Sequence, residues 1–200
     1  MRARDNPFAS DRILQIRYRP QTGSWDQLLE RLAQMDYRAA VVGPEGTGKT
    51  TLLEDLGDQL ALRGFTAKPL RLDEEQPEFE PDFLDEFFAA VTPRDLLMLD
   101  GAEQMGRLAW FQFRRRARAA GGLVITSHRP GRLPTLLECA TTPALLAEIV
   151  TDLLGSERAV AALDLRELHE RHAGNLRHAL RELYDVYAEQ PADAFTAGPA

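Results

Sequence analysis

Short apolar runs alternate with helical patterns along the chain as far as residue 142. Two of these runs, Arg38–Gly43 and Leu96–Leu99, have the length and apolar composition of buried strands, and the segment Thr66–Leu72 between them predicts another strand. A fourth, Leu123–Ser127, ends in polar residues, and Leu136–Thr141 predicts a shorter fifth strand. Because apolar strands that alternate with helices build a parallel sheet covered on both faces, the pattern predicts an α/β fold.

Leucine and aromatic residues recur at helical spacing between these strands. Ser24 and Gln27 have the spacing of a capping box, which predicts a helix just after Ser24. The helices predicted in this part of the chain cover residues 25–35, 49–62, a segment from Pro81 that buries Phe83, Leu84, Phe87, Phe88 and Val91, and 107–119.

The pattern changes after Thr142, because three helical segments then follow one another without a strand. They are Pro143–Leu154, Leu163–His172 and Asn175–Ala188. The sequence therefore predicts four parts: an N-terminal linker and helix (1–37), an α/β core (38–142), a small helical lid (143–190) and a flexible tail (191–200).

A phosphate-binding motif lies between the first predicted strand and the helix that follows it. Residues Gly43–Thr50 match G-x-x-x-x-G-K-[ST], the P-loop. Glycines let the backbone N–H groups point inward at phosphates, while Lys49 reaches the β- and γ-phosphates and the Thr50 hydroxyl ligates Mg²⁺. The competing interpretation is a plain Gly-rich turn. The predicted nucleotide-binding residues are Gly43, Pro44, Glu45, Gly46, Thr47, Gly48, Lys49, Thr50 and Thr51.

Asp100 follows the apolar run Leu96–Leu99 and is the predicted second Mg²⁺ ligand. A carboxylate at the end of a neighbouring strand lies across from Thr50 in P-loop proteins, as the Walker B element. The competing interpretation is that Asp100-Gly101 is only a turn that closes the strand.

These elements resemble those of the AAA+ and related additional-strand P-loop ATPases. The resemblance implies a parallel-sheet P-loop NTPase core with a C-terminal helical lid, binding ATP and Mg²⁺. Members of this group keep a glutamate just after the Walker B aspartate to polarise water, whereas here the next residue is Gly101. Glu103, three positions after Asp100, is the candidate catalytic base. If Glu103 is instead a helix cap or a solvated residue, hydrolysis is expected to be slow or absent.

The resemblance to AAA+ proteins extends over residues 38–190. Thr126, Ser127 and His128 form a polar strand tip like the element called sensor 1. Gly174 and Arg177 resemble the start of the last lid helix, whose arginine contacts the γ-phosphate as sensor 2. A strand-end turn and an exposed helix-start arginine are the competing interpretations.

Two further roles are implied by the same resemblance. Tyr18 lies where AAA+ linkers pack on the adenine, although it also suits a plain core position. Arg132, or failing that Arg129, matches the arginine finger that reaches the ATP of the next subunit in a homo-oligomer. Both arginines also suit a simple Pro-Gly turn.

The net charge indicates which classes of partner are favoured. With 31 acidic against 24 basic residues, the net charge is −7, so a nucleic-acid partner is less favoured than a protein partner or a homo-oligomer. The basic run Arg114–Arg118 and the acidic segment Asp73–Asp82 are expected to be solvated faces or local partner surfaces. The chain lacks a run of membrane length and an apolar leader, and it has a single cysteine, Cys139, so we expect a cytoplasmic location without membrane contact.

Three functions fit these features. The first is an ATPase whose lid couples the ATP or ADP state to a partner. The second is a P-loop small-molecule kinase, and the third is an interaction module that binds ATP with little hydrolysis. Strand order separates the first two, because a strand between the P-loop strand and the Asp100 strand favours the ATPase.

Overall fold

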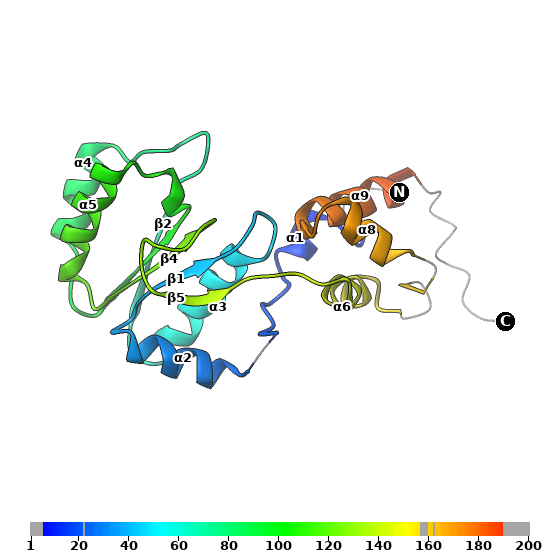
Figure 1. Ribbon diagram of the computed structural model, residues 1–200, viewed down its shortest axis with the longest axis horizontal. Coiled ribbons are helices and arrows are strands. Elements are labelled where there is room, and N and C mark those ends of the chain that lie inside the picture. The colour runs from blue at the N-terminus through cyan, green and yellow to red at the C-terminus, as the bar shows by residue number, and fades with distance from the viewer. Residues whose placement is uncertain (1–5, 22, 157–159, 162, 190–200) are drawn as a thin grey trace. The chain divides into compact units, whose positions relative to one another are not determined.

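The chain folds into two compact units. The computed structural model describes residues 6–21, 23–156, 160–161 and 163–189. The sheet unit comprises Arg17–Pro44 and Gly48–Cys139, while the helical unit comprises the described residues up to Ile16, Glu45–Thr47 and those from Ala140 onward (Figure 1). Each unit has its own apolar core.

The sheet unit is built on five strands in the order β2-β3-β4-β1-β5, all paired in parallel. This arrangement confirms the predicted parallel α/β core. Strand β4 lies between the P-loop strand β1 and the Asp100 strand β3, which is the order expected for the ATPase. The strands span Arg38–Val42 (β1), Thr66–Arg71 (β2), Asp95–Asp100 (β3), Gly122–Ser127 (β4) and Thr135–Glu138 (β5).

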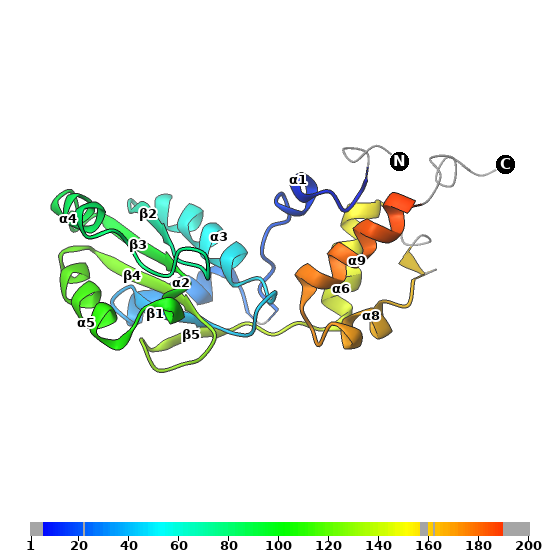
Figure 2. The ribbon, with the colours of Figure 1, turned by 90° about the horizontal axis from the view of Figure 1, so that it is seen from above.

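Alternate residues of the central strands point to opposite faces of the sheet. Ala39 and Val41 pack with the leucines of α2 and α3, while Ala40 and Val42 share a core with α4 and α5. Helices therefore cover both faces (Figure 2). The helices of this unit are α2 (Trp25–Gln34, with the predicted Ser24 capping box), α3 (Lys49–Ala61), α4 (Pro81–Ala89) and α5 (Arg107–Arg116), with 3₁₀ turns η2 (Ala102–Gln104) and η3 (Ala117–Ala119).

The prediction that α4 buries Phe83 is wrong. Phe83 is 46% exposed, whereas Leu84, Phe87 and Phe88 pack against the core. These three residues lie at i, i+3 and i+4 and form the single inward stripe of a short helix. Phe83 precedes Leu84 by one position, about 100° around the helix, and is left outside that stripe.

The helical unit has a core to which the N-terminal segment contributes. Phe8 is fully buried there, and its ring meets Tyr187 edge to face at 5.0 Å. The Asn6 side chain donates a hydrogen bond of 2.8 Å to the Tyr184 carbonyl. The described helices of this unit are α1 (Ser10–Ile13), α6 (Pro143–Leu154), α8 (Leu165–Arg171) and α9 (Leu176–Glu189).

None of the helices formed by the described residues is sufficiently long and apolar to cross a membrane.

Candidate nucleotide and magnesium site

The predicted P-loop connects β1 to α3 in the expected strand–loop–helix context. Gly46 and Gly48 have φ values of 72° and 85°, which favour glycine, and Gly48 is the residue that precedes the helix. A Cβ at Gly46 would lie 2.0 Å from the side-chain oxygen of Asn175. The backbone therefore favours glycine at these two positions of the motif.

Lys49 is folded into the curve of the loop. Its ammonium group donates a hydrogen bond of 2.7 Å to the carbonyl of Pro44, and the residue is only 8% exposed. At the start of the loop, the Gly43 N–H donates to the Ser127 carbonyl at the tip of β4. The loop is thus hydrogen-bonded to the adjacent strand β4. The Lys49 ammonium lies among the backbone groups that are predicted to bind phosphates.

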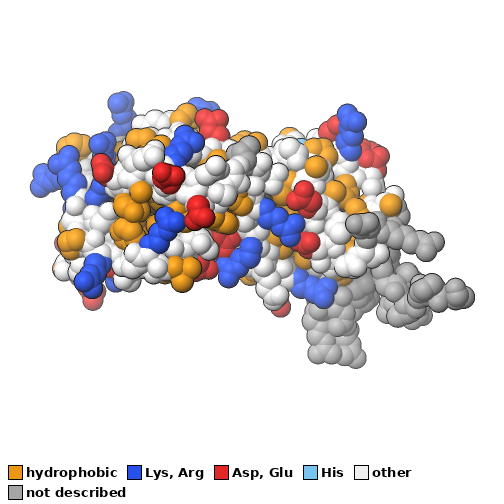
Figure 3. Space-filling model, turned by 90° about the horizontal axis from the view of Figure 1, so that it is seen from below, with side chains coloured by type: hydrophobic (Ala, Val, Ile, Leu, Met, Phe, Trp, Pro, Cys, Tyr) orange, Lys and Arg blue, Asp and Glu red, His pale blue; other side chains and the backbone are white. Residues whose placement is uncertain are grey.

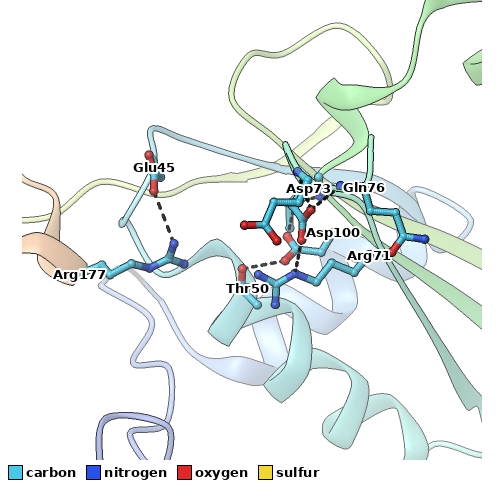
Figure 4. A network of polar contacts seen from close by, with 10 residues as sticks. Glu45, Thr50, Arg71, Asp73, Gln76, Asp100 and Arg177 are labelled. Atoms are coloured by element: carbon cyan, nitrogen blue, oxygen red, sulfur yellow. Dashed lines mark hydrogen bonds and ion pairs between the residues drawn. The ribbon is translucent and has the colours of Figure 1, made fainter. Parts of the chain in front are cut away.

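Two hydroxyl groups converge on the carboxylate of Asp100, which lies at the carboxyl end of β3. The Thr50 hydroxyl donates to one carboxylate oxygen at 2.9 Å (Figure 4), and the buried Thr126 hydroxyl donates to the other at 2.5 Å. Thr126 in turn accepts a hydrogen bond of 2.8 Å from the Gly101 N–H. Thr126, predicted as part of sensor 1, therefore holds Asp100 in place.

This donor set suits a magnesium ion. Mg²⁺ prefers hard oxygen ligands and is commonly held by one or two protein oxygens together with phosphate and water. The hydroxyl of Thr50 and the carboxylate of Asp100 already face each other within hydrogen-bond distance. Their chemistry and spacing fit the predicted ligand pair.

Gly101 explains the departure from the AAA+ pattern. Its φ is 79°, and a Cβ at this position would lie 2.1 Å from the carbonyl oxygen of Leu72 on the neighbouring chain segment. The Leu72 N–H bonds back to the Asp100 carbonyl, so that segment is held close. A glutamate cannot follow Asp100 here without moving the backbone.

Glu103 lies just beyond, on the turn η2, and its side chain is 23% exposed. One carboxylate oxygen is 3.1 Å from Nε2 of His128. The other, Oε2, is buried and has no hydrogen-bond partner among the described residues. Glu103 lines a hollow of about 370 Å³ together with Ser127, His128, Arg129 and Arg132. The structure thus brings the candidate base and the predicted sensor 1 tip together.

The two candidate arginine fingers differ in their surroundings. Arg132 donates to the Met105 carbonyl at 2.5 Å, and its guanidinium lies over the Trp110 ring at 5.2 Å. Burial lowers the pKa of Arg132. Arg129 is exposed, and only its backbone N–H contacts Ser127.

Tyr18 lies beside the end of the P-loop. Its ring is 3.8 Å from the point where a Cβ of Gly48 would lie, and it packs edge to face with Trp25. Burial raises the pKa of the Tyr18 hydroxyl well above its usual range. Asp55 holds this segment on α3, because it accepts the Tyr18 N–H at 2.5 Å and the Arg17 guanidinium at 2.6 Å.

Asp55 is a residue that the sequence analysis missed. It is only 6% exposed, on the buried face of α3 near Leu52 and Leu56. The available signal was a carboxylate at core spacing in an amphipathic helix, which requires a partner. A second missed group is the loop after β2, where Asp73 accepts the backbone N–H of Gln76 and faces Arg71 at 3.9 Å (Figure 4).

Arg177 lies in the first turn of α9, within the helical unit. Its guanidinium is 3.4 Å from the carboxylate of Glu45, and the Leu176 N–H donates to the Gly46 carbonyl at 3.1 Å. Gly174 has φ 80° and accepts a hydrogen bond of 2.7 Å from the Thr141 hydroxyl. The predicted sensor 2 arginine is thus placed beside two residues of the P-loop motif.

Comparisons with known proteins show which fold surrounds these residues. The chain matches no protein-family model and no curated protein. Solved structures do match. A mutant RuvB of Thermotoga maritima has a TM-score of 0.56 at 16% identity, over 80% of this chain and 61% of that chain. The replication initiator DnaA, bound to AMPPCP and single-stranded DNA, has a TM-score of 0.56 at 13% identity, over 82% and 60%.

NtrX from Brucella abortus, in complex with ATP, also has a TM-score of 0.56, at 12% identity over 92% of this chain and 53% of that chain. The chain therefore spans about half to three fifths of the length of these proteins. All of them are AAA+ P-loop ATPases with a parallel sheet. The chain has the fold of the AAA+ P-loop ATPases.

Proposed function

We propose that this chain is a small ATPase of the AAA+ type that binds ATP with Mg²⁺. The observation that carries the proposal is the bond between Thr50 and Asp100 beside a P-loop, in a sheet where β4 separates the two strands. This strand order also disfavours the small-molecule kinase, which calls for adjacent P-loop and Asp100 strands.

The residues divide the work of nucleotide binding. The backbone N–H groups of the loop and the Lys49 ammonium hold the phosphates, and Thr50 with Asp100 holds the metal ion, which neutralises charge on the phosphates when bound. Thr126 keeps the Asp100 carboxylate oriented. Tyr18, beside Gly48, is proposed to pack on the base.

For hydrolysis, we assign the role of general base to Glu103. Its Oε2 is free of protein hydrogen bonds in the described residues, and His128 fixes the other oxygen. A water held at Oε2 would lose a proton to the carboxylate as it attacks the γ-phosphate.

Arg177 is proposed to contact the γ-phosphate. Loss of that phosphate would release α9 from the nucleotide, so the helical unit would report the nucleotide state to a partner. For a trans arginine finger, Arg129 is the better candidate, because Arg132 is already bound to Met105 and Trp110.

A protein partner or a second copy is favoured over nucleic acid. On the face shown in Figure 3, Lys and Arg side chains are interspersed with Asp, Glu and hydrophobic ones rather than forming a continuous basic surface. Phosphate backbones are bound by clustered positive charge, whereas the net charge here is −7.

The P-loop assignment is tested by Lys49→Ala. We expect it to lower the affinity for ATP with Mg²⁺ by at least about tenfold, because it removes a charge directed at phosphates. Calorimetric titration of wild type and mutant measures this. Lys68→Ala, which changes a lysine on β2, is the matched control and should bind ATP normally. Unchanged affinity in Lys49→Ala would contradict the assignment.

The second candidate function is an ATP-binding module with little hydrolysis. One observation favours it: only glycine fits at position 101, so the glutamate that AAA+ ATPases keep after the Walker B aspartate is absent. Glu103→Gln separates it from the ATPase. If Glu103 is the base, this variant keeps ATP affinity and loses about 10²–10⁴-fold in turnover, because the basic oxygen is removed.

Phosphate release, measured alone and with DNA, RNA or co-purifying proteins, gives this result. Glu54→Gln, on the exposed side of α3, is the control with the same chemical change. Equal turnover in wild type and Glu103→Gln would show that another residue is the general base. No turnover in wild type under any of these conditions supports the binding module.

A further inference from the structure

A groove of about 510 Å³ runs between α4 with its preceding loop and α5. These two helices lie side by side on one face of the sheet (Figures 1 and 2). The groove belongs entirely to the sheet unit and is separate from the P-loop. Its floor is apolar, formed by residues such as Phe79, Leu84 and Phe113, with the rings of Phe79 and Phe113 stacked at 6.4 Å.

The two sides of the groove carry opposite charges. Glu78 and Asp85 come from the side of the preceding loop and α4, while Arg115 and Arg116 come from α5. Asp85 and Arg116 neutralise each other across the groove at 2.7 Å. The side chains of Glu78 and Arg115 take part in no hydrogen bond or ion pair with any other residue that the structure describes.

We call the side of the groove that carries Glu78 and Asp85 the acidic strip, and the side that carries Arg115 and Arg116 the basic strip. The apolar floor lies between the two strips, and Glu78 and Arg115 are their unpaired charges among the described residues.

Large apolar side chains also stand on this surface. Phe111, which lines the groove, is 64% exposed, and Leu108, one helical turn before it, is 71% exposed. Burying such a side chain contributes roughly 1.5–3 kcal/mol. Two of them on the same side of one helix, next to an apolar groove, form a surface suited to a protein contact.

We propose that this groove is a self-complementary interface through which two copies of the chain form a twofold dimer. A twofold axis that runs along the groove places the acidic strip of each copy against the basic strip of the other, so both charge contacts form at once. The same operation brings Phe111 of each copy onto the apolar floor of its partner.

The charge pattern selects this occupant over others. A nucleic acid would meet Arg115 but would be repelled by Glu78 on the other side of the groove. A uniformly acidic peptide would face the same repulsion. A second copy offers a basic strip to the acidic strip and an acidic strip to the basic strip, so both contacts are attractive. The dimer does not require ATP, so it stands or falls independently of the proposed ATPase function.

Sedimentation velocity of the full chain without nucleotide, from about 1 to 100 µM, provides the test. Wild type is expected to be dimeric in the upper part of this range. Reversing the unpaired charge of the basic strip with Arg115→Glu, or that of the acidic strip with Glu78→Arg, places like charges opposite each other. Each variant should raise the dimer dissociation constant at least about tenfold.

Mixing the two variants gives the sharpest outcome. In a mixed dimer, the unpaired charges of one copy are both acidic and those of the other are both basic, so both contacts are attractive again. The mixture should therefore dimerise although neither variant does so alone. Arg94→Glu makes the same net charge change as Arg115→Glu at an exposed position outside the groove and should dimerise like wild type.

Circular dichroism melts establish that the variants remain folded, since all the changed side chains are exposed. A wild type that stays monomeric at 100 µM overturns the proposal. So does a dimer that both reversals leave unchanged, or a mixture that stays monomeric. A monomer that binds a labelled DNA duplex through Arg115 would assign the basic strip to nucleic acid and also overturn the proposal.

Discussion

Gly101 determines which side chain is available as a base near Asp100. Its left-handed backbone and its approach to the Leu72 carbonyl exclude any side chain. Glu103, to which we assign the role of general base, lies two positions after Gly101 on a 3₁₀ turn, with one carboxylate oxygen 3.1 Å from Nε2 of His128. Under the proposed function, the carboxylate that activates water comes from this turn rather than from the position after Asp100.

The steric role of Gly101 predicts a large effect of Gly101→Ala on stability. A left-handed φ costs an L-residue about 1–2 kcal/mol, and the methyl group would also overlap the Leu72 carbonyl. We expect the free energy of unfolding in urea to fall by about 3 kcal/mol or more. Gly64→Ala is a matched control, because Gly64 has φ 90° and open space around it. Equal losses in both variants would show that the contact with Leu72 is unimportant.

At the level of single residues, the sequence predicts the P-loop and Asp100 because their chemistry is local. It does not predict that Thr126 bonds to Asp100, since that bond depends on β4 lying next to β3. Asp55 was missed for a similar reason. Its partners, Arg17 and the Tyr18 N–H, come from a segment without periodic pattern.

At the scale of elements, Asp55 connects the N-terminal segment to α3. Asp55→Ala leaves the Tyr18 N–H without its acceptor and removes the shorter of the two carboxylate bonds of Arg17, so we expect the free energy of unfolding to fall by about 1–3 kcal/mol. Urea denaturation measures the change. Asp58 also bonds to Arg17 but is 65% exposed, so Asp58→Ala should cost about 0–1 kcal/mol. Similar losses in the two variants would contradict a special role for Asp55.

The hydrophobic pattern predicts well where helices and strands form. The predicted strands and helices that fall on described residues all form, including the short β5 at Thr135–Glu138. The errors occur where tertiary packing determines which side chains are buried and where a helix ends. Phe83 lies outside the buried stripe of α4, and α5 gives way to a 3₁₀ turn after Arg116. Both features depend on tertiary contacts that a periodic pattern does not encode.

At the scale of the whole molecule, the chain passes between its two units more than once. Residues 45–47 of the P-loop motif belong to the helical unit, while Gly48 and the residues after it belong to the sheet unit. The P-loop motif therefore contains residues of both units.

The burial of Phe8 has a consequence for the order of folding. Asn6 bonds to Tyr184 across 178 residues of sequence, and Phe8 packs on Tyr187, so the core of the helical unit joins the two ends of the described chain. Contacts of such long sequence separation form slowly, because a long loop must close first. During synthesis the sheet unit, complete at Cys139, has all its strands before α9 exists. We therefore expect the helical core to close after the sheet has formed, around a phenylalanine that precedes the sheet unit in the sequence.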